Sequence, residues 1–115
     1  MMQNRVAFLA ARKGVRAHAK NLRIEAVRTQ SHGDQPRIGL TVTKKNGNAV
    51  MRNRIKRRMR AAIISVSTDE MRCDHDYVFI SKPNALNAPF ESLRSDIRAL
   101  IESSHKRLDE KSVKS

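Results

Sequence analysis

Residues 38–60 read IGLTVTKKNGNAVMRNRIKRRMR, and this stretch decides the fold that the sequence predicts. Its first six residues alternate large apolar side chains with small ones, the period-two pattern of a β-strand. The apolar set is Ile38, Leu40 and Val42, and the small set is Gly39, Thr41 and Thr43. Because the second set is small and bears hydroxyl groups, we expect that face of the strand to be open.

A basic helix is expected to follow this strand. Residues 44–48 predict a tight loop, with Gly47 at an unusual backbone angle and Asn48 as the helix N-cap. From Ala49 onward, apolar residues recur at spacings of four, four, three and four, which predicts a helix with one buried stripe. The stripe consists of Met51, Ile55, Met59, Ala62 and Val66.

Charge is the dominant feature of this segment. Between Lys44 and Arg60 there are eight basic residues and no acidic one, although like charges at helical spacing repel each other by about 0.2–0.5 kcal/mol. The whole chain has 24 Lys and Arg against 11 Asp and Glu, a formal net charge of +13. Such an excess indicates a polyanionic partner, most commonly nucleic acid. Arginine dominates the helix, and its planar guanidinium binds phosphate bidentately and stacks on bases, which favours structured RNA.

A helical projection places basic residues on both sides of the buried stripe. One rim is Arg52, Lys56 and Arg60, the other is Arg54 and Arg58, and Asn53 and Arg57 lie on the far side. We expect one rim to overhang the open strand face and form a groove for an extended single strand. Phe8, in a chain with four aromatic residues, is either a core residue or a stacking platform for a base.

The rest of the chain predicts a small α/β domain. A helix is expected over residues 4–13, ended by Gly14 as a left-handed C-cap, and a half-buried strand over residues 22–27. Turn-forming residues occupy 31–36. The nearly continuous apolar run in residues 76–81 is typical of a central strand covered on both faces.

A final helix is expected after Pro89. Its core face consists of Phe90, Leu93, Ile97, Leu100, Ile101 and Leu108, and residues 109–115 are expected to form a frayed, disordered tail. The length and the absence of repeats predict one domain over residues 1–115, of α/β class, with a single mixed sheet packed by about three helices.

Other classes of site find little support in the sequence. Cys73 is the only cysteine, so neither a disulfide framework nor a cysteine-based zinc site is expected. The four histidines show no metal-ligand spacing, and we expect no catalytic residue and no metal site in the polypeptide. No apolar stretch reaches the length of a membrane span or a signal peptide, so a cytoplasmic protein without membrane contact is expected.

Residues 39–60 closely resemble the signature of the bacterial ribonuclease P protein family. The match covers GLTVTKK, then GNAV, then RNRIKR followed by Arg60, and it includes the Arg-Asn-Arg core of the family motif. Weaker similarity extends to Phe8 and Gly14, to residues 76–78 and to the final helix. The resemblance implies a fold like the second domain of ribosomal protein S5, with a left-handed crossover between parallel strands.

The resemblance also implies a function. The family's holoenzyme is an endonuclease in which a catalytic RNA and its Mg²⁺ remove the 5′ leader of precursor tRNA, while one protein assists one RNA and binds no cofactor itself. By matching position, the RNA-binding candidates are Lys44, Lys45, Asn48, Arg52, Asn53, Arg54, Lys56, Arg57 and Arg60. Phe8 and Thr41 are weaker candidates for contact with the leader.

Three features depart from the family pattern. Asn46 stands where an apolar residue is usual, the N-terminus is short of basic residues, and Arg12 replaces an aromatic residue. The alternative reading is an α/β RNA-binding or ribosomal protein with no part in a nuclease. A basic-zipper helix is excluded because no leucine heptads follow Arg60. A membrane-surface helix is a poorer fit, since the apolar stripe is short and is needed for the core.

Overall fold

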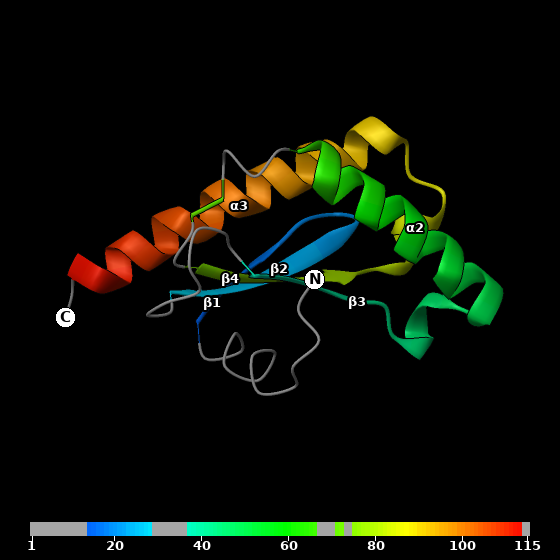
Figure 1. Cartoon of the computed structure of the whole chain (residues 1–115), viewed down its shortest axis with the longest axis horizontal. Helices are drawn as coiled ribbons and strands as arrows, with labels where there is room; N and C mark the ends of the chain where they lie inside the picture. The colour runs from blue at the N-terminus through cyan, green and yellow to red at the C-terminus, as the bar shows by residue number, and fades with distance from the viewer. Residues whose placement is uncertain (1–13, 29–36, 67–70, 73–74, 114–115) are drawn as a thin grey trace.

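The computed structural model describes residues 14–28, 37–66, 71–72 and 75–113, and its main feature is a four-stranded mixed sheet (Figure 1). The strands are β1 (Val15–His18), β2 (Leu22–Arg28), β3 (Arg37–Thr41) and β4 (His75–Ser81), and they lie in the order β1-β2-β4-β3. β3 and β4 are parallel, whereas the β1–β2 and β2–β4 pairs are antiparallel. The expected α/β class with a single mixed sheet is therefore confirmed.

Two α-helices, α2 (Ala49–Ser65) and α3 (Phe90–Val113), cover one face of the sheet (Figure 1). α2 joins the parallel strands β3 and β4, and α3 crosses β1 and β2. Two short 3₁₀ helices, η1 (Lys44–Asn46) and η3 (Pro83–Leu86), stand before α2 and α3. The helix expected over residues 4–13 and the turn over 31–36 lie outside the described residues, so two of the three expected helices are seen.

The core lies between the sheet and the two helices. Alternate residues of β2 and β4 point towards the helices, and those side chains are fully buried: Leu22, Ile24, Ala26, Tyr77 and Phe79. The helices contribute a second buried set: Ile55, Met59, Ala62, Leu93, Ile97 and Ile101. β4 lies between β2 and β3 and is buried along almost its whole length, which confirms the prediction of a central strand.

β1 was not expected from the sequence. Its four residues carry only two apolar side chains, Val15 and Ala17, and too short an alternation to be read as a strand. Gly14 also differs from expectation, because its φ is not positive and it does not form a left-handed cap. A Cβ atom at this position would lie 1.8 Å from the carbonyl oxygen of Ala26, so glycine is required by the close approach to β2.

The buried faces of α2 and α3 follow the predicted apolar periodicity, but individual residues differ from the prediction. Met51 is 41% exposed although it was placed in the buried stripe, and Phe90 is 39% exposed although it was placed in the core. Both occupy a first helical turn at the end of the sheet. Ile63 is buried instead, because α2 packs against α3 as well as the sheet and needs a broader apolar face.

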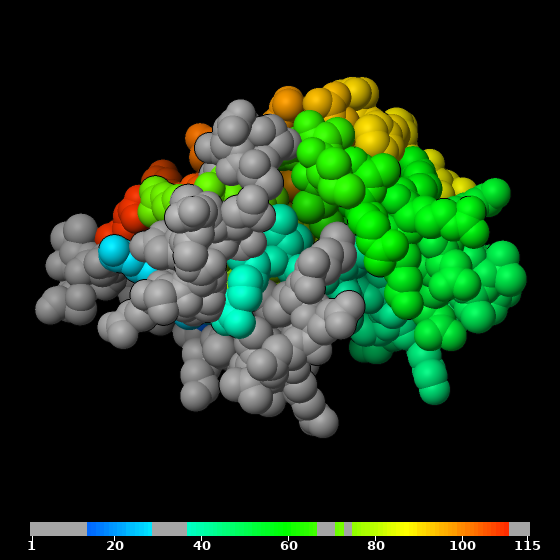
Figure 2. Space-filling view, viewed as in Figure 1, coloured from blue at the N-terminus to red at the C-terminus, as the bar shows by residue number. Residues whose placement is uncertain are grey.

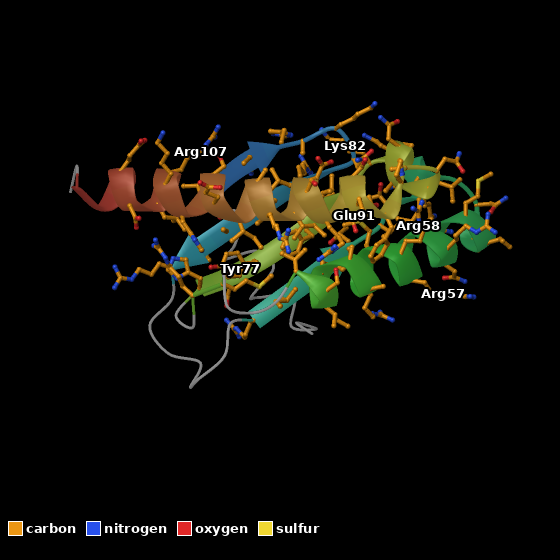
Figure 3. The ribbon with its side chains drawn as sticks, turned by 90° about the horizontal axis from the view of Figure 1, so that it is seen from above. Arg57, Arg58, Tyr77, Lys82, Glu91 and Arg107 are labelled. Atoms are coloured by element: carbon orange, nitrogen blue, oxygen red, sulfur yellow. The ribbon has the colours of Figure 1, made fainter. Side chains whose placement is uncertain are left out.

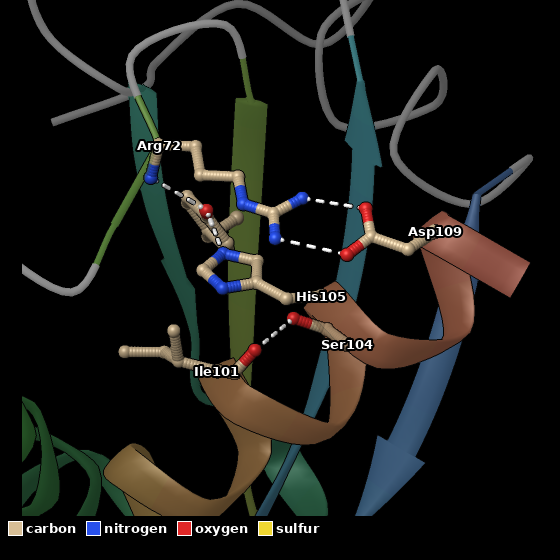
Figure 4. Close-up of polar contacts among 6 residues, drawn as sticks. Arg72, Ile101, Ser104, His105 and Asp109 are labelled. Carbon is tan, nitrogen blue, oxygen red and sulfur yellow. Dashed lines mark hydrogen bonds and ion pairs between the residues drawn. The ribbon is translucent and has the colours of Figure 1, made fainter. Parts of the chain in front are cut away.

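The last turns of α3 are held by polar contacts with β4 and the residues before it (Figure 4). The Tyr77 hydroxyl lies 2.5 Å from His105 Nε2 and accepts a hydrogen bond from the Arg72 backbone N–H at 2.9 Å. Arg72 also pairs bidentately with Asp109, at 2.8 and 3.0 Å. The tail expected to fray from Asp109 is therefore helical as far as Val113.

Candidate RNA interface

The loop before α2 is shaped by Asn46 and Gly47. Gly47 has φ 120°, and a Cβ atom there would lie 2.6 Å from the sulfur of Met51, which confirms the expected need for glycine. The Asn46 side chain is only 5% exposed. Its Nδ2 donates to the carbonyl and the hydroxyl oxygen of Thr43, and its Oδ1 accepts from the Ser81 hydroxyl at 3.1 Å. These bonds tie the loop that carries Lys44 and Lys45 to the end of β4.

Asn48 is the N-cap of α2, as predicted. Its side-chain oxygen accepts a hydrogen bond from the Met51 backbone N–H at 2.9 Å. The first turn of α2 has no acidic residue, so the positive end of the helix dipole is not offset by a carboxylate on the helix. The exposed N-terminal turn therefore adds to the positive potential of the basic side chains around it.

Six cations of the predicted site are exposed and have no partner. Within the described part of the chain, their side chains make neither a hydrogen bond nor an ion pair; they are Lys44, Lys45, Arg54, Lys56, Arg57 and Arg60. Asn53 is exposed among them. α2 runs along the surface of the molecule, and Arg57 points away from α3 (Figures 2 and 3). The structure thus brings these site candidates together on one helix and the loop before it.

Two arginines of the same helix, Arg52 and Arg58, are half-buried. Arg58 points towards the η3 segment and donates hydrogen bonds to the carbonyl oxygens of Ala85, Leu86 and Ala88 (Figure 3). Arg58 therefore links the segment before α3 to α2 and stabilises the fold. Arg52 is half-buried, and its Nε atom is buried without a hydrogen-bond partner in the described structure.

The outward face of α2 also exposes aliphatic residues that the charge pattern did not single out. Val50 is 78% exposed and Ile64 is 72% exposed. At 100° per residue, both project on the same side as Arg57, opposite the buried stripe. The helical projection of the sequence already places Val50 and Ile64 on this outward face, and that was the signal that could have identified them.

Thr41, one of the two leader-side candidates, does not share a face with α2. Thr41 pairs with Ile80 in the β3–β4 register, and its side chain lies on the sheet face opposite Phe79 and the helices. The single groove expected between the arginine rim and Thr41 is thus corrected to two surfaces on opposite sides of β3. Phe8 lies outside the described residues.

The sheet face that bears Thr41 is less open than expected. Gly39 is buried and Thr41 is half-buried, while Thr43 is exposed. At the far end of β3, Arg37 pairs bidentately with the buried carboxylate of Asp76, at 3.0 and 2.8 Å, and this contact raises the pKa of Arg37. The face therefore carries both charged and apolar groups.

The described residues offer neither a membrane-spanning helix nor a metal-binding cluster. None of their helices is long and apolar enough to cross a membrane. The same residues contain no group of three or more His, Cys, Asp and Glu side chains arranged to hold a metal ion.

Comparisons with known proteins all point to one family. The family model described as Ribonuclease P matches residues 2–105. The ribonuclease P protein component of Brucella melitensis biotype 1 is 41% identical over 108 residues, which cover 87% of this chain and 76% of the relative. The corresponding protein of Bartonella quintana (strain Toulouse) is 41% identical over 105 residues, covering 87% of this chain and 79% of the relative.

Solved structures share the fold. The RNase P protein of Staphylococcus aureus matches with a TM-score of 0.73 at 22% identity, over 93% of this chain and 95% of that one. The RNase P protein of Thermotoga maritima matches with a TM-score of 0.71 at 20% identity, over 86% and 91% of the two chains. Fold and site together define a small α/β domain whose surface presents a basic helix with exposed, unpaired cations in the described structure. The chain belongs to the ribonuclease P protein family.

Proposed function

We propose that this chain is the protein subunit of a ribonuclease P holoenzyme, in which it binds the catalytic RNA and the 5′ leader of precursor tRNA and assists endonucleolytic removal of that leader. The observation that carries the proposal is the set of six exposed, unpaired cations on α2 and its preceding loop. In a member of this family, such a surface fits the phosphates of the RNA subunit. One protein would pair with one RNA in the cytoplasm.

Hydrolysis in this proposal belongs to the RNA and its Mg²⁺. The candidate site consists mainly of Arg and Lys side chains, and a guanidinium stays protonated in proteins and cannot serve as a general base. The protein's part is electrostatic, because fixed cations reduce the repulsion between the phosphates of the two RNAs. The same neutralisation would lower the concentration of Mg²⁺ that the reaction needs.

We assign the two RNA partners to two surfaces. The candidates for contact with the catalytic RNA are Lys44, Lys45, Asn48, Arg52, Asn53, Arg54, Lys56, Arg57 and Arg60. Phe8 and Thr41 are the candidates for contact with the leader. The position of Thr41 on the sheet face opposite α2 supports this division, since one strand of RNA on each surface would not compete with the other.

Reconstitution tests the proposal. The protein is added to a bacterial ribonuclease P RNA and a precursor tRNA, at a Mg²⁺ concentration where the RNA alone cleaves slowly. We expect the protein to lower the Mg²⁺ requirement and the KM for precursor tRNA, and to lose the KM effect when the leader is shortened to one nucleotide. If the protein binds the RNA but changes neither quantity, it is an RNA-binding protein outside the nuclease.

A further inference from the structure

An open cavity of about 680 Å³, lined by both polar and apolar groups, lies beside the first turns of α3. Its walls come from the turn between β1 and β2, from the η3 segment and from the first two turns of α3. The volume is within the range of about 300–1,000 Å³ that is usual for small-molecule sites. None of the predicted RNA-binding residues lines this cavity, so it is distinct from the α2 surface.

One wall of the cavity is fixed around Asn21, which is only 3% exposed. Its backbone N–H and its Nδ2 both donate to Asp96 Oδ2, at 3.1 and 2.9 Å. Its carbonyl oxygen accepts from the Lys82 backbone N–H at 2.9 Å. Lys82 Nζ donates to the Ala19 carbonyl oxygen at 2.6 Å. The three segments are therefore held together before any ligand enters.

The opposite wall is fixed by the basic helix itself. Arg58 donates to the carbonyl oxygens of Ala85 at 2.9 Å and Leu86 at 2.6 Å, and also to that of Ala88. Arg58, Lys82 and Glu91 all lie near the start of α3 (Figure 3). The cavity wall formed by the η3 segment is thus joined to α2 through Arg58.

The groups that line the cavity are left free to bind. In the described structure, the side chains of Lys20, Asn87, Ser92 and Ser95 make no hydrogen bond and no ion pair, and neither does the second carboxylate oxygen of Asp96. Pro83, Ala88 and Pro89 supply apolar surface between them. The free set contains an ammonium group, an amide, two hydroxyls and one carboxylate acceptor.

We infer that this cavity binds one unpaired RNA base that carries an amino group, an inference that rests on the proposed RNA partner. The free oxygen of Asp96 accepts a hydrogen bond from an amino group of adenine, cytosine or guanine. Uracil offers carbonyl oxygens in the equivalent place, which a carboxylate repels. The Asn87 amide can pair with a base edge, and the proline rings provide surfaces for its faces. Glu91 and Asp96 disfavour a phosphate inside the cavity, whereas Lys20 can meet a neighbouring one.

Titration of the full-length ¹⁵N-labelled protein with nucleoside monophosphates tests this inference. AMP, CMP and GMP should produce saturable shifts in the amide signals of Asn84, Asn87 and Ser92. UMP and ribose 5-phosphate should bind about tenfold more weakly, the effect of losing one well-placed base contact. Equal shifts with ribose 5-phosphate would mean that Lys20 merely attracts an anion, and would overturn the inference.

A pair of matched variants controls for non-specific effects. Ser95→Trp places a bulky side chain at an exposed position that lines the cavity, and Ala99→Trp places the same side chain one turn further along, outside the lining. Both positions are solvent-exposed on α3, so both variants should fold, which far-UV circular dichroism verifies. Ser95→Trp should weaken AMP binding at least about tenfold, and Ala99→Trp should leave it within about twofold. Unchanged AMP binding in Ser95→Trp, or no saturable shift in the wild type, contradicts the inference.

Measurement on the RNA complex separates this inference from the proposed function. Ser95→Trp should weaken binding to ribonuclease P RNA several-fold without changing the dependence of affinity on salt, because a base contact releases no counterion. If the wild type fails to bind this RNA, the proposed function fails, and the nucleotide titration still decides about the cavity. If the RNA affinity of Ser95→Trp equals that of the wild type, the cavity has no role in that complex.

Discussion

Asn46 is a polar residue buried in the loop that carries Lys44 and Lys45. Its position is usually apolar in the family that the sequence resembles, yet both the nitrogen and the oxygen of its side-chain amide find partners here. A buried amide costs free energy unless it is hydrogen-bonded, so the hydroxyls of Thr43 and Ser81 account for its presence. Asn46 and Ser81 therefore act as a pair that fixes the loop to β4.

Asn46→Ala should lower the free energy of unfolding by about 1–3 kcal/mol, because it leaves the buried Ser81 hydroxyl without its acceptor. Ser81→Ala should also be destabilising, while the double variant should lose less than the sum of the two single losses. Urea unfolding of the four proteins measures the coupling. Strictly additive losses would show that the two side chains do not depend on each other.

At the scale of elements, α2 shows what sequence patterning predicts and what it misses. Its start at Asn48 and its buried face followed from a capping residue and a regular apolar spacing, both local properties. The role of Arg58 could not be predicted in this way, because its acceptors are backbone carbonyl groups, which every residue has. β1 was missed for a related reason, since a four-residue strand is defined by its pairing with β2 more than by its own residues.

The two kinds of arginine on α2 predict different effects on stability. Arg58→Ala should lower the free energy of unfolding by about 1–3 kcal/mol, because it removes three hydrogen bonds to the η3 segment. Arg54→Ala, one turn earlier and without a partner, should stay within about 0.5 kcal/mol of the wild type. Urea unfolding compares the two. Equal effects would mean that the Arg58 contacts contribute nothing to the fold.

At the scale of the whole molecule, His105 connects the C-terminal half of α3 to Tyr77 of β4. Burial, followed by the charge of Arg72 and then that of His75, lowers the pKa of His105 to about 4, with Asp109 acting in the opposite direction. The same Arg72 contact lowers the pKa of Asp109. Neutral His105 can accept a hydrogen bond from the Tyr77 hydroxyl through Nε2, and protonation of Nε2 removes that acceptor.

Stability should therefore fall in mild acid. The unfolded chain binds the His105 proton near the ordinary pKa of 6.5, whereas the folded chain binds it only near 4. The contribution is thus present above about pH 6.5 and lost as the pH falls towards about 4. His105→Gln keeps an acceptor oxygen but cannot titrate. In urea unfolding across this range, the wild type should lose more stability than the variant, and parallel curves would contradict this account.

The central claim is that the unpaired cations of α2 bind the phosphates of ribonuclease P RNA. The most direct measurement is the affinity of the full-length protein for that RNA as a function of salt concentration. The matched proteins are Arg54→Ala/Arg57→Ala on α2 and Arg98→Ala/Lys106→Ala on α3, which lose the same charge from exposed positions.

The account predicts weaker binding for the α2 variant, with the slope of log affinity against log salt reduced by about 0.7–0.9 for each lost phosphate contact. The α3 variant should keep a slope close to that of the wild type. Equal slopes for the wild type and the α2 variant, or an equal loss in both variants, would contradict α2 as the surface that binds the RNA.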